Sequence, residues 1–232
     1  MKKLILSTAV AIAITAPAIA AAQTAFQGFY AQIATGYQTT KFGSVTGQVQ
    51  GIPIAIGPVY ATSEQFNVST APAILGLGYN FALNRKWVLG VGVDYDVVTK
   101  QTNFGTTAGN ASKSITGFAE MKVGNRWSLY LAPGYVATKD GLVYGKVGYA
   151  QAKATVSSYS GSGSQTLNGW LLGLGWRQQF SSALYGFLEA NYMGYGKPSW
   201  TGTSSAIAPN ATVTYQPSVN AYNVLVGVGV KF

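Results

Sequence analysis

The chain contains no cysteine and no histidine, and only 9% of its residues are charged. Without cysteine it has no disulfide framework and no thiol chemistry. Without histidine it lacks the commonest general base and metal ligand, and a Ser-His-acid catalytic site is excluded. A typical soluble domain has about 25% charged residues. The composition therefore argues against a water-facing globule, and we expect no enzyme activity, no bound metal and no cofactor.

The chain also has few long apolar runs. One run spans residues 4–14, directly after two lysines, and small residues follow it. A transmembrane helix needs about 20 apolar residues, so this run is too short to be one. The layout predicts a secretory signal peptide over residues 1–22, cleaved after Ala20 or Ala22. The mature chain, 23–232, then forms one domain.

Apolar residues are nevertheless frequent, at 48% of the chain, and the end of the sequence shows how they are arranged. In the last eleven positions every second residue is aliphatic or aromatic: Tyr222, Val224, Val226, Val228, Val230 and Phe232. The residues between them are small or polar, apart from Leu225. Successive side chains of a strand point to opposite faces. The pattern is typical of a strand with lipid on one side and a barrel interior on the other.

The same alternation predicts seven earlier strands, at about 26–39, 69–81, 86–100, 115–137, 142–154, 168–180 and 183–196. Gly124-Asn125-Arg126 resembles a hairpin turn, but a turn there would give nine strands. Bacterial single-chain barrels have an even number. We therefore predict one long strand with a bulge near Gly124. Apolar residues occupy odd-numbered positions both before and after Gly124, including Met121, Val123 and Trp127.

The connections support this arrangement. Three are short, near residues 84–85, 140–141 and 181–182, and they alternate with four long ones, predicted as loops at 40–70, 101–114, 156–167 and 197–218. Tight periplasmic turns and long extracellular loops alternate in this way in outer-membrane barrels. The predicted fold is all-β: an eight-stranded antiparallel up-and-down transmembrane β-barrel, preceded by a cleaved signal peptide.

Along the predicted strands, charged residues occupy the alternate positions, on the face opposite to the one that carries the aliphatic residues. Those predicted to face inward as a polar network are Asp94, Asp96, Glu120, Lys122, Lys146, Arg177 and Glu189. A basic residue facing lipid at the midplane would cost about 2–4 kcal/mol, which favours the interior placement. Buried charges need partners, so we expect Asp94 or Glu189 to pair with Arg177 or Lys146. Eight strands leave little free space, which favours a structural core over an ion pathway.

The segment from Trp127 to Ala154 resembles the OmpX-like and opacity-protein-like outer-membrane barrels, chiefly through Pro133-Gly134-Tyr135 and the stretch 144–149 (Y-G-K-V-G-Y). Residues 188–192 and the terminal Phe232 resemble the last two strands of the same families. The resemblance implies insertion by the outer-membrane assembly machinery, with Tyr222, Val230 and Phe232 as its C-terminal signal. It also implies a role in adhesion, surface defence or envelope integrity, acting through the loops.

Loops and rim are the remaining places for a function. The loop segments 51–58 and 206–209 are unusually apolar, which marks either an interaction surface or self-packing. Four lysines near the outer rim are expected to contact lipopolysaccharide phosphates: Lys41, Lys113, Lys153 and Lys197. The net charge of +9 is scattered, with no basic run, so no nucleic acid is expected. We expect a non-enzymatic barrel with a polar packed interior, whose loops serve surface interaction (adhesion), with a host or surface ligand, or envelope integrity. The alternative is a narrow passive channel for small solutes or ions.

Overall fold

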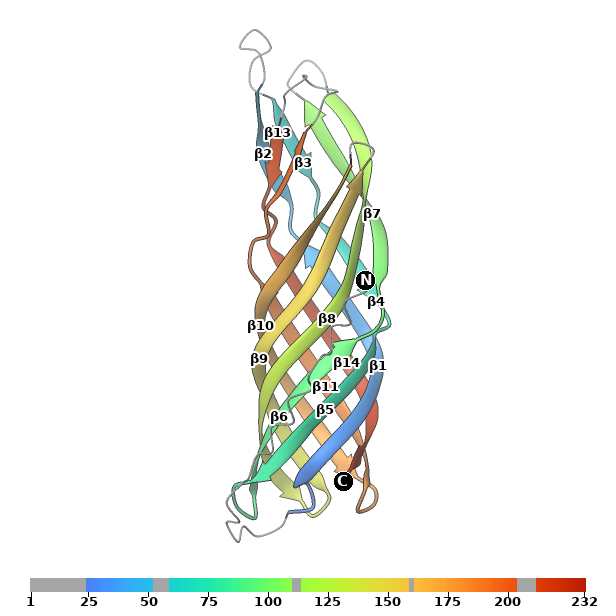
Figure 1. Ribbon diagram of the computed structural model, residues 1–232, viewed down its shortest axis with the longest axis vertical. Helices are drawn as coiled ribbons and strands as arrows, with labels where there is room; N and C mark the ends of the chain where they lie inside the picture. Colours follow the sequence, from blue (N-terminus) through green and yellow to red (C-terminus); the bar gives the residue numbers. More distant parts are fainter. Residues whose placement is uncertain (1–23, 52–58, 110–113, 159–160, 204–211) are drawn as a thin grey trace, which may run out of the picture.

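The computed structural model describes residues 24–51, 59–109, 114–158, 161–203 and 212–232. The predicted signal peptide lies outside these residues, as do nearly all of segment 51–58, the whole of segment 206–209, and Lys113. Figure 1 shows a tall cylinder of tilted strands with the C-terminus at its lower end. No helix in the described ranges is long and apolar enough to cross a membrane.

The strands are β1 (Gly28–Phe42), β2 (Val45–Gln50), β3 (Tyr60–Ser63), β4 (Phe66–Thr70), β5 (Ala73–Ala82), β6 (Trp87–Asp96), β7 (Lys100–Gly109), β8 (Ser114–Thr138), β9 (Gly141–Ser158), β10 (Gly161–Gln179), β11 (Leu184–Tyr195), β12 (Trp200–Thr203), β13 (Thr212–Tyr215) and β14 (Val219–Lys231).

Eight of these strands close a ring in the order β1-β5-β6-β8-β9-β10-β11-β14, each antiparallel to its neighbours. The ring closes where β14 pairs with β1 along thirteen positions, from Tyr30↔Lys231 to Phe42↔Val219. Full closure leaves no unpaired strand edge within the membrane, as a bilayer requires. The predicted eight-stranded up-and-down barrel is confirmed.

The lower end carries the three short turns, as predicted. In the turn between β5 and β6 the Asn84 side chain accepts hydrogen bonds from the backbone N–H groups of Lys86 (2.8 Å) and Trp87 (2.9 Å). Thr138 pairs with Gly141 at the turn between β8 and β9. The third turn, between β10 and β11, uses Ser181 in the same manner as Asn84. Side-chain acceptors thus replace the ladder bonds that end here.

The upper end differs from the prediction, because the long connections contain strands instead of irregular loops. β2, β3, β7, β12 and β13, with the upper parts of β8, β9 and β10, form a sheet above the eight-stranded ring. We call this sheet, together with β4, the extension (Figure 1). The sequence of the extension does not have an aliphatic residue at every second position, so the alternation of apolar residues did not predict its strands. Strand pairing needs only backbone partners, and Thr and Val favour extended backbone.

β8 is one long strand with an irregularity near Gly124, as predicted, but the consequence of that irregularity was predicted wrongly. The pairing with β9 shifts between Gly124 and Trp127, and Asn125 has a positive φ of 48°. One extra residue in a strand reverses the faces of everything beyond it. Met121 and Val123 are therefore buried inside the extension. Lys122 is exposed and Glu120 half-buried on the outer parity, so neither belongs to the interior network.

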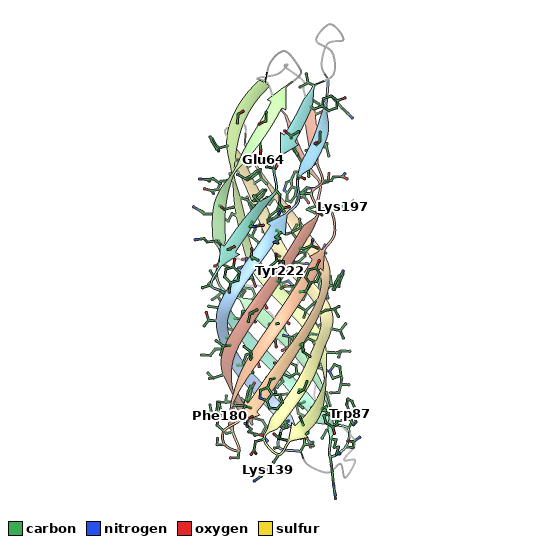
Figure 2. The ribbon with its side chains drawn as sticks, turned by 180° about the vertical axis from the view of Figure 1, so that it is seen from behind. Glu64, Trp87, Lys139, Phe180, Lys197 and Tyr222 are labelled. Carbon is green, nitrogen blue, oxygen red and sulfur yellow. The ribbon has the colours of Figure 1, made fainter. Side chains whose placement is uncertain are left out.

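Between the two ends, the outer surface is an apolar band bounded by aromatic residues. Trp87 packs against Tyr135 at the lower edge with ring centroids 5.2 Å apart, and Trp127 packs against Tyr149 at the upper edge at 5.5 Å. The strands between these edges have about the 9–11 residues that a tilted membrane strand needs. Figure 2 shows Trp87 and Phe180 near the lower end and Tyr222 near mid-height, so the extension stands above the membrane band.

Candidate functional site

The centre of the barrel holds an ionic triad. Lys146, from β9, donates to Asp94 of β6 and to Glu189 of β11, with both Nζ–O distances 2.8 Å. All three residues are at most 9% exposed. The ammonium group also lies over the Tyr130 ring, 3.9 Å from its centroid, and the Tyr144 hydroxyl donates to Glu189 at 3.0 Å. Strand alternation turns each of these residues inward, and barrel closure brings three distant strands together.

A second ion pair lies above the triad. Arg126 contacts Asp96 through Nη2 at 2.7 Å and through Nε at 2.9 Å, and it donates to the Val98 carbonyl at 3.0 Å. The sequence-based prediction included Asp96 but omitted Arg126, which had been assigned to the irregularity at Gly124. Its even parity, shared with inward Ser128 and Tyr130, was the signal that could have identified it.

Amide side chains connect the two charge groups. Asn191 donates to Glu189 at 2.7 Å and to Asn223 at 2.9 Å. Gln38 lies 3.0 Å from Asn223 and 3.5 Å from Asp96. Buried polar groups are costly unless they are hydrogen-bonded. This chain of amides therefore joins the five charged residues of the triad and the second ion pair in one hydrogen-bonded interior.

Arg177 does not pair with a carboxylate, contrary to the expected alternative in which it shared the acids with Lys146. Its guanidinium lies over the rings of Tyr185 and Tyr30, 4.3 and 4.6 Å from their centroids. One Nη contacts Gln32 at 3.4 Å, while Nε has no partner among the described residues. Cation–π contacts are strongest when both groups are desolvated. The tyrosine rings therefore substitute for a counter-ion.

The interior charges cancel as a set. Among the residues that the structure describes, the buried charged ones are three acids and three bases: Asp94, Asp96, Glu189, Arg126, Lys146 and Arg177. Within the described ranges, the remaining basic residues outnumber the remaining acids and are exposed or half-buried. At the upper rim Lys41 lies over the Tyr222 ring at 5.0 Å, and Lys153 and Lys197 are exposed; Figure 2 labels Lys197 above Tyr222. These three lysines lie outside the polar interior, and their contact with lipopolysaccharide stays a prediction.

Little free space remains inside. Inward glycines face the large rings: Gly92 faces Tyr130, and Gly175 faces Tyr144. A Cβ at either glycine would collide with the ring, as expected for a tightly filled barrel. A cavity of about 40 Å³ lies beside Asp96 and Arg126, and one of about 10 Å³ lies beside Arg177. A water molecule needs roughly 10–15 Å³ of such space, so the cavities hold a few waters at most.

Apolar clusters close the interior at both ends. Above the ion pairs, the extension buries Phe42, Val68, Met121, Val123, Ala152, Ala154, Leu167 and Val219. The Phe66 ring stacks on Phe42 and on Phe104, with centroids 4.9 and 4.3 Å away. Below, Phe26 packs against Val88 and Leu142, and its carbonyl accepts from Asn80 at 2.9 Å. Apolar side chains therefore lie both above and below the charged interior.

The interior side chains form ion pairs and hydrogen bonds with one another. The sequence as a whole is similar to a known family of barrels. The family model for the outer membrane protein beta-barrel domain matches residues 6–232. The chain belongs to this family. Membership places it in the bacterial outer membrane, with the apolar band facing lipid.

Solved structures of outer-membrane proteins are similar to this chain, and one of them, OprG, shows the same fold. The outer membrane protein OprG from Pseudomonas aeruginosa matches with a TM-score of 0.58 at 17% identity, over 90% of this chain and 99% of that one. The outer membrane protease OmpT from Escherichia coli matches at 0.48 and 10% identity, over 91% and 99%. The attachment invasion locus protein Ail of Yersinia pestis matches at 0.46 and 15% identity, over 89% and 99%. No curated protein sequence matches this member of the family.

Proposed function

We propose that this barrel is a non-enzymatic, non-conducting outer-membrane protein whose extension serves surface interaction (adhesion) or envelope integrity. The observation that carries the proposal is the closed interior. Three acids and three bases neutralise one another, and apolar clusters cover them above and below. An ion crossing this path would have to break buried ion pairs and then enter an apolar cluster without hydration, which is strongly unfavourable.

The extension supports a role at the cell surface. It raises a paired sheet above the membrane band, where the outward residues are mostly polar. Phe118 of β8 is a large apolar side chain among them, and it is 80% exposed. Its neighbour across the ladder, Gly105 of β7, provides no side chain to cover it. Exposed aromatic residues on a rigid sheet are suited to contact a partner.

Two measurements test the proposal. Planar-bilayer recordings of the folded protein should show no single-channel steps. A strain lacking the gene should lose attachment to surfaces or become sensitive to detergent, and the wild-type gene should restore the property. Phe118→Ser should fail to restore attachment while still forming a heat-modifiable barrel. An unchanged deletion strain, or attachment unaffected by Phe118→Ser, would refute the surface role.

The passive channel stays the second candidate, because two small cavities lie among the polar and charged interior residues. Reproducible conductance steps that disappear in Glu189→Gln or Arg177→Gln would establish it. Heat-modifiability of both variants would show that the barrel still forms.

A further inference from the structure

The bulge in β8 changes which side of the wall Lys122 occupies. Without the extra residue between Gly124 and Trp127, the parity of β8 would direct Lys122 into the barrel. With it, Lys122 is exposed, while its neighbours Met121 and Val123 fill the apolar seal. Bulges commonly re-aim a side chain in this way.

On the outer face, Lys122 becomes a neighbour of Lys153. Gly124 pairs with Lys153 and Lys122 pairs with Thr155, so the two lysines stand diagonally across the β8–β9 ladder. Diagonal side chains are about 7–8 Å apart, a spacing that a phosphate group between two long flexible side chains can bridge. Among the described residues, no carboxylate lies within ion-pair distance of either lysine.

The two lysines lie directly above the membrane boundary. Below them, the Trp127 indole donates to Gln151 at 3.0 Å and the Tyr149 hydroxyl donates to Asn168 at 2.8 Å. Trp and Tyr mark the level of the headgroups in membrane barrels. Beside them, the Thr155 and Ser164 hydroxyls form a 2.8 Å hydrogen bond. We call the Thr155 and Ser164 hydroxyls the polar shelf; they lie beside the two lysines, above the aromatic rings.

We propose that Lys122 and Lys153 form a binding site for the phosphate of an outer-leaflet glycolipid, with its acyl chains against the apolar band and its sugar against the polar shelf. Lys41 over Tyr222 is on β1, away from this face, and is not part of the site. The inference deepens the envelope role proposed above and rests on it.

The test measures the affinity of the folded protein, purified in nonionic detergent, for bisphosphorylated lipid A. Lys122→Gln with Lys153→Gln should weaken binding about tenfold, since two charge-assisted contacts are lost. Lys122→Arg with Lys153→Arg should retain binding. The matched control is Lys86→Gln with Lys139→Gln, which removes two exposed lysines at the lower end and should leave the affinity unchanged. Heat-modifiable migration verifies that each variant is folded.

The site would be overturned by unchanged affinity in the Lys122/Lys153 double variant, by an equal loss in the lower-end control, or by equal binding of dephosphorylated lipid A by the wild type. Binding of inorganic phosphate without binding of lipid A would also overturn it, because the proposal commits to the membrane lipid. Failure of the envelope role is seen separately, as a deletion strain without a phenotype.

Discussion

Replacing Lys146 by Met tests whether the interior charges hold the barrel together. The substitution keeps an unbranched side chain of similar length but removes the ammonium group that contacts Asp94 and Glu189 at 2.8 Å each. Removing one partner of a buried ion pair costs about 3–5 kcal/mol, because the other charge stays buried and unpaired. Lys146 serves two carboxylates, so the loss in the free energy of unfolding should lie at the upper end of that range.

The measurement is a urea titration of the refolded protein in lipid vesicles, followed by tryptophan fluorescence and by heat-modifiable migration. Lys153→Met is the matched control on the same strand. Its side chain is exposed, and surface substitutions usually change stability by less than about 0.5 kcal/mol.

A compensated variant separates charge imbalance from lost packing. Combining Lys146→Met with Asp94→Asn and Glu189→Gln removes all three charges but leaves the Tyr144 and Asn191 hydrogen bonds an acceptor. Neutral replacement of a whole buried ion group is often harmless or stabilising, so most of the stability should return. A single Lys146→Met variant as stable as the Lys153→Met control, or a triple variant less stable than the single one, would refute the reasoning.

Three other predictions follow from named contacts. In otherwise cysteine-free protein, Lys122→Cys should react with a membrane-impermeant maleimide on intact cells and Met121→Cys should not; the reverse pattern would show that the bulge does not invert β8. Phe26→Ala should lower the free energy of unfolding by about 3 kcal/mol as the lower seal is lost, and an unchanged urea midpoint would show that this terminal segment is not docked. Deleting Phe232 should reduce the amount of heat-modifiable barrel in outer-membrane fractions while refolding in detergent still succeeds; equal amounts in cells would remove its role as an assembly signal.

The membrane-spanning half of the molecule was predictable because lipid imposes one rule on every strand. A residue in the band is either apolar and outward or hidden inside, so alternation alone placed Asp94, Lys146 and Glu189 in the interior. The even strand number then resolved the ambiguity at Gly124. Above the membrane that rule no longer holds, because water accepts polar side chains on the outer face. The extension strands were therefore predicted as loops.

Two features depended on the tertiary structure: the partners of the interior charges and the side of the barrel wall on which Lys122 lies. Alternation could not say which inward charges meet, because Lys146 and Arg177 share a face but differ in their cross-barrel neighbours; barrel closure gave both acids to Lys146 and three tyrosine rings to Arg177. Nor could it say on which side Lys122 lies, because one unpaired residue in β8 reverses every face beyond it. Local sequence thus determined the barrel and its lipid face, since both depend on a period of two. Partners and the inversion depend on register between strands, which only the folded ring sets.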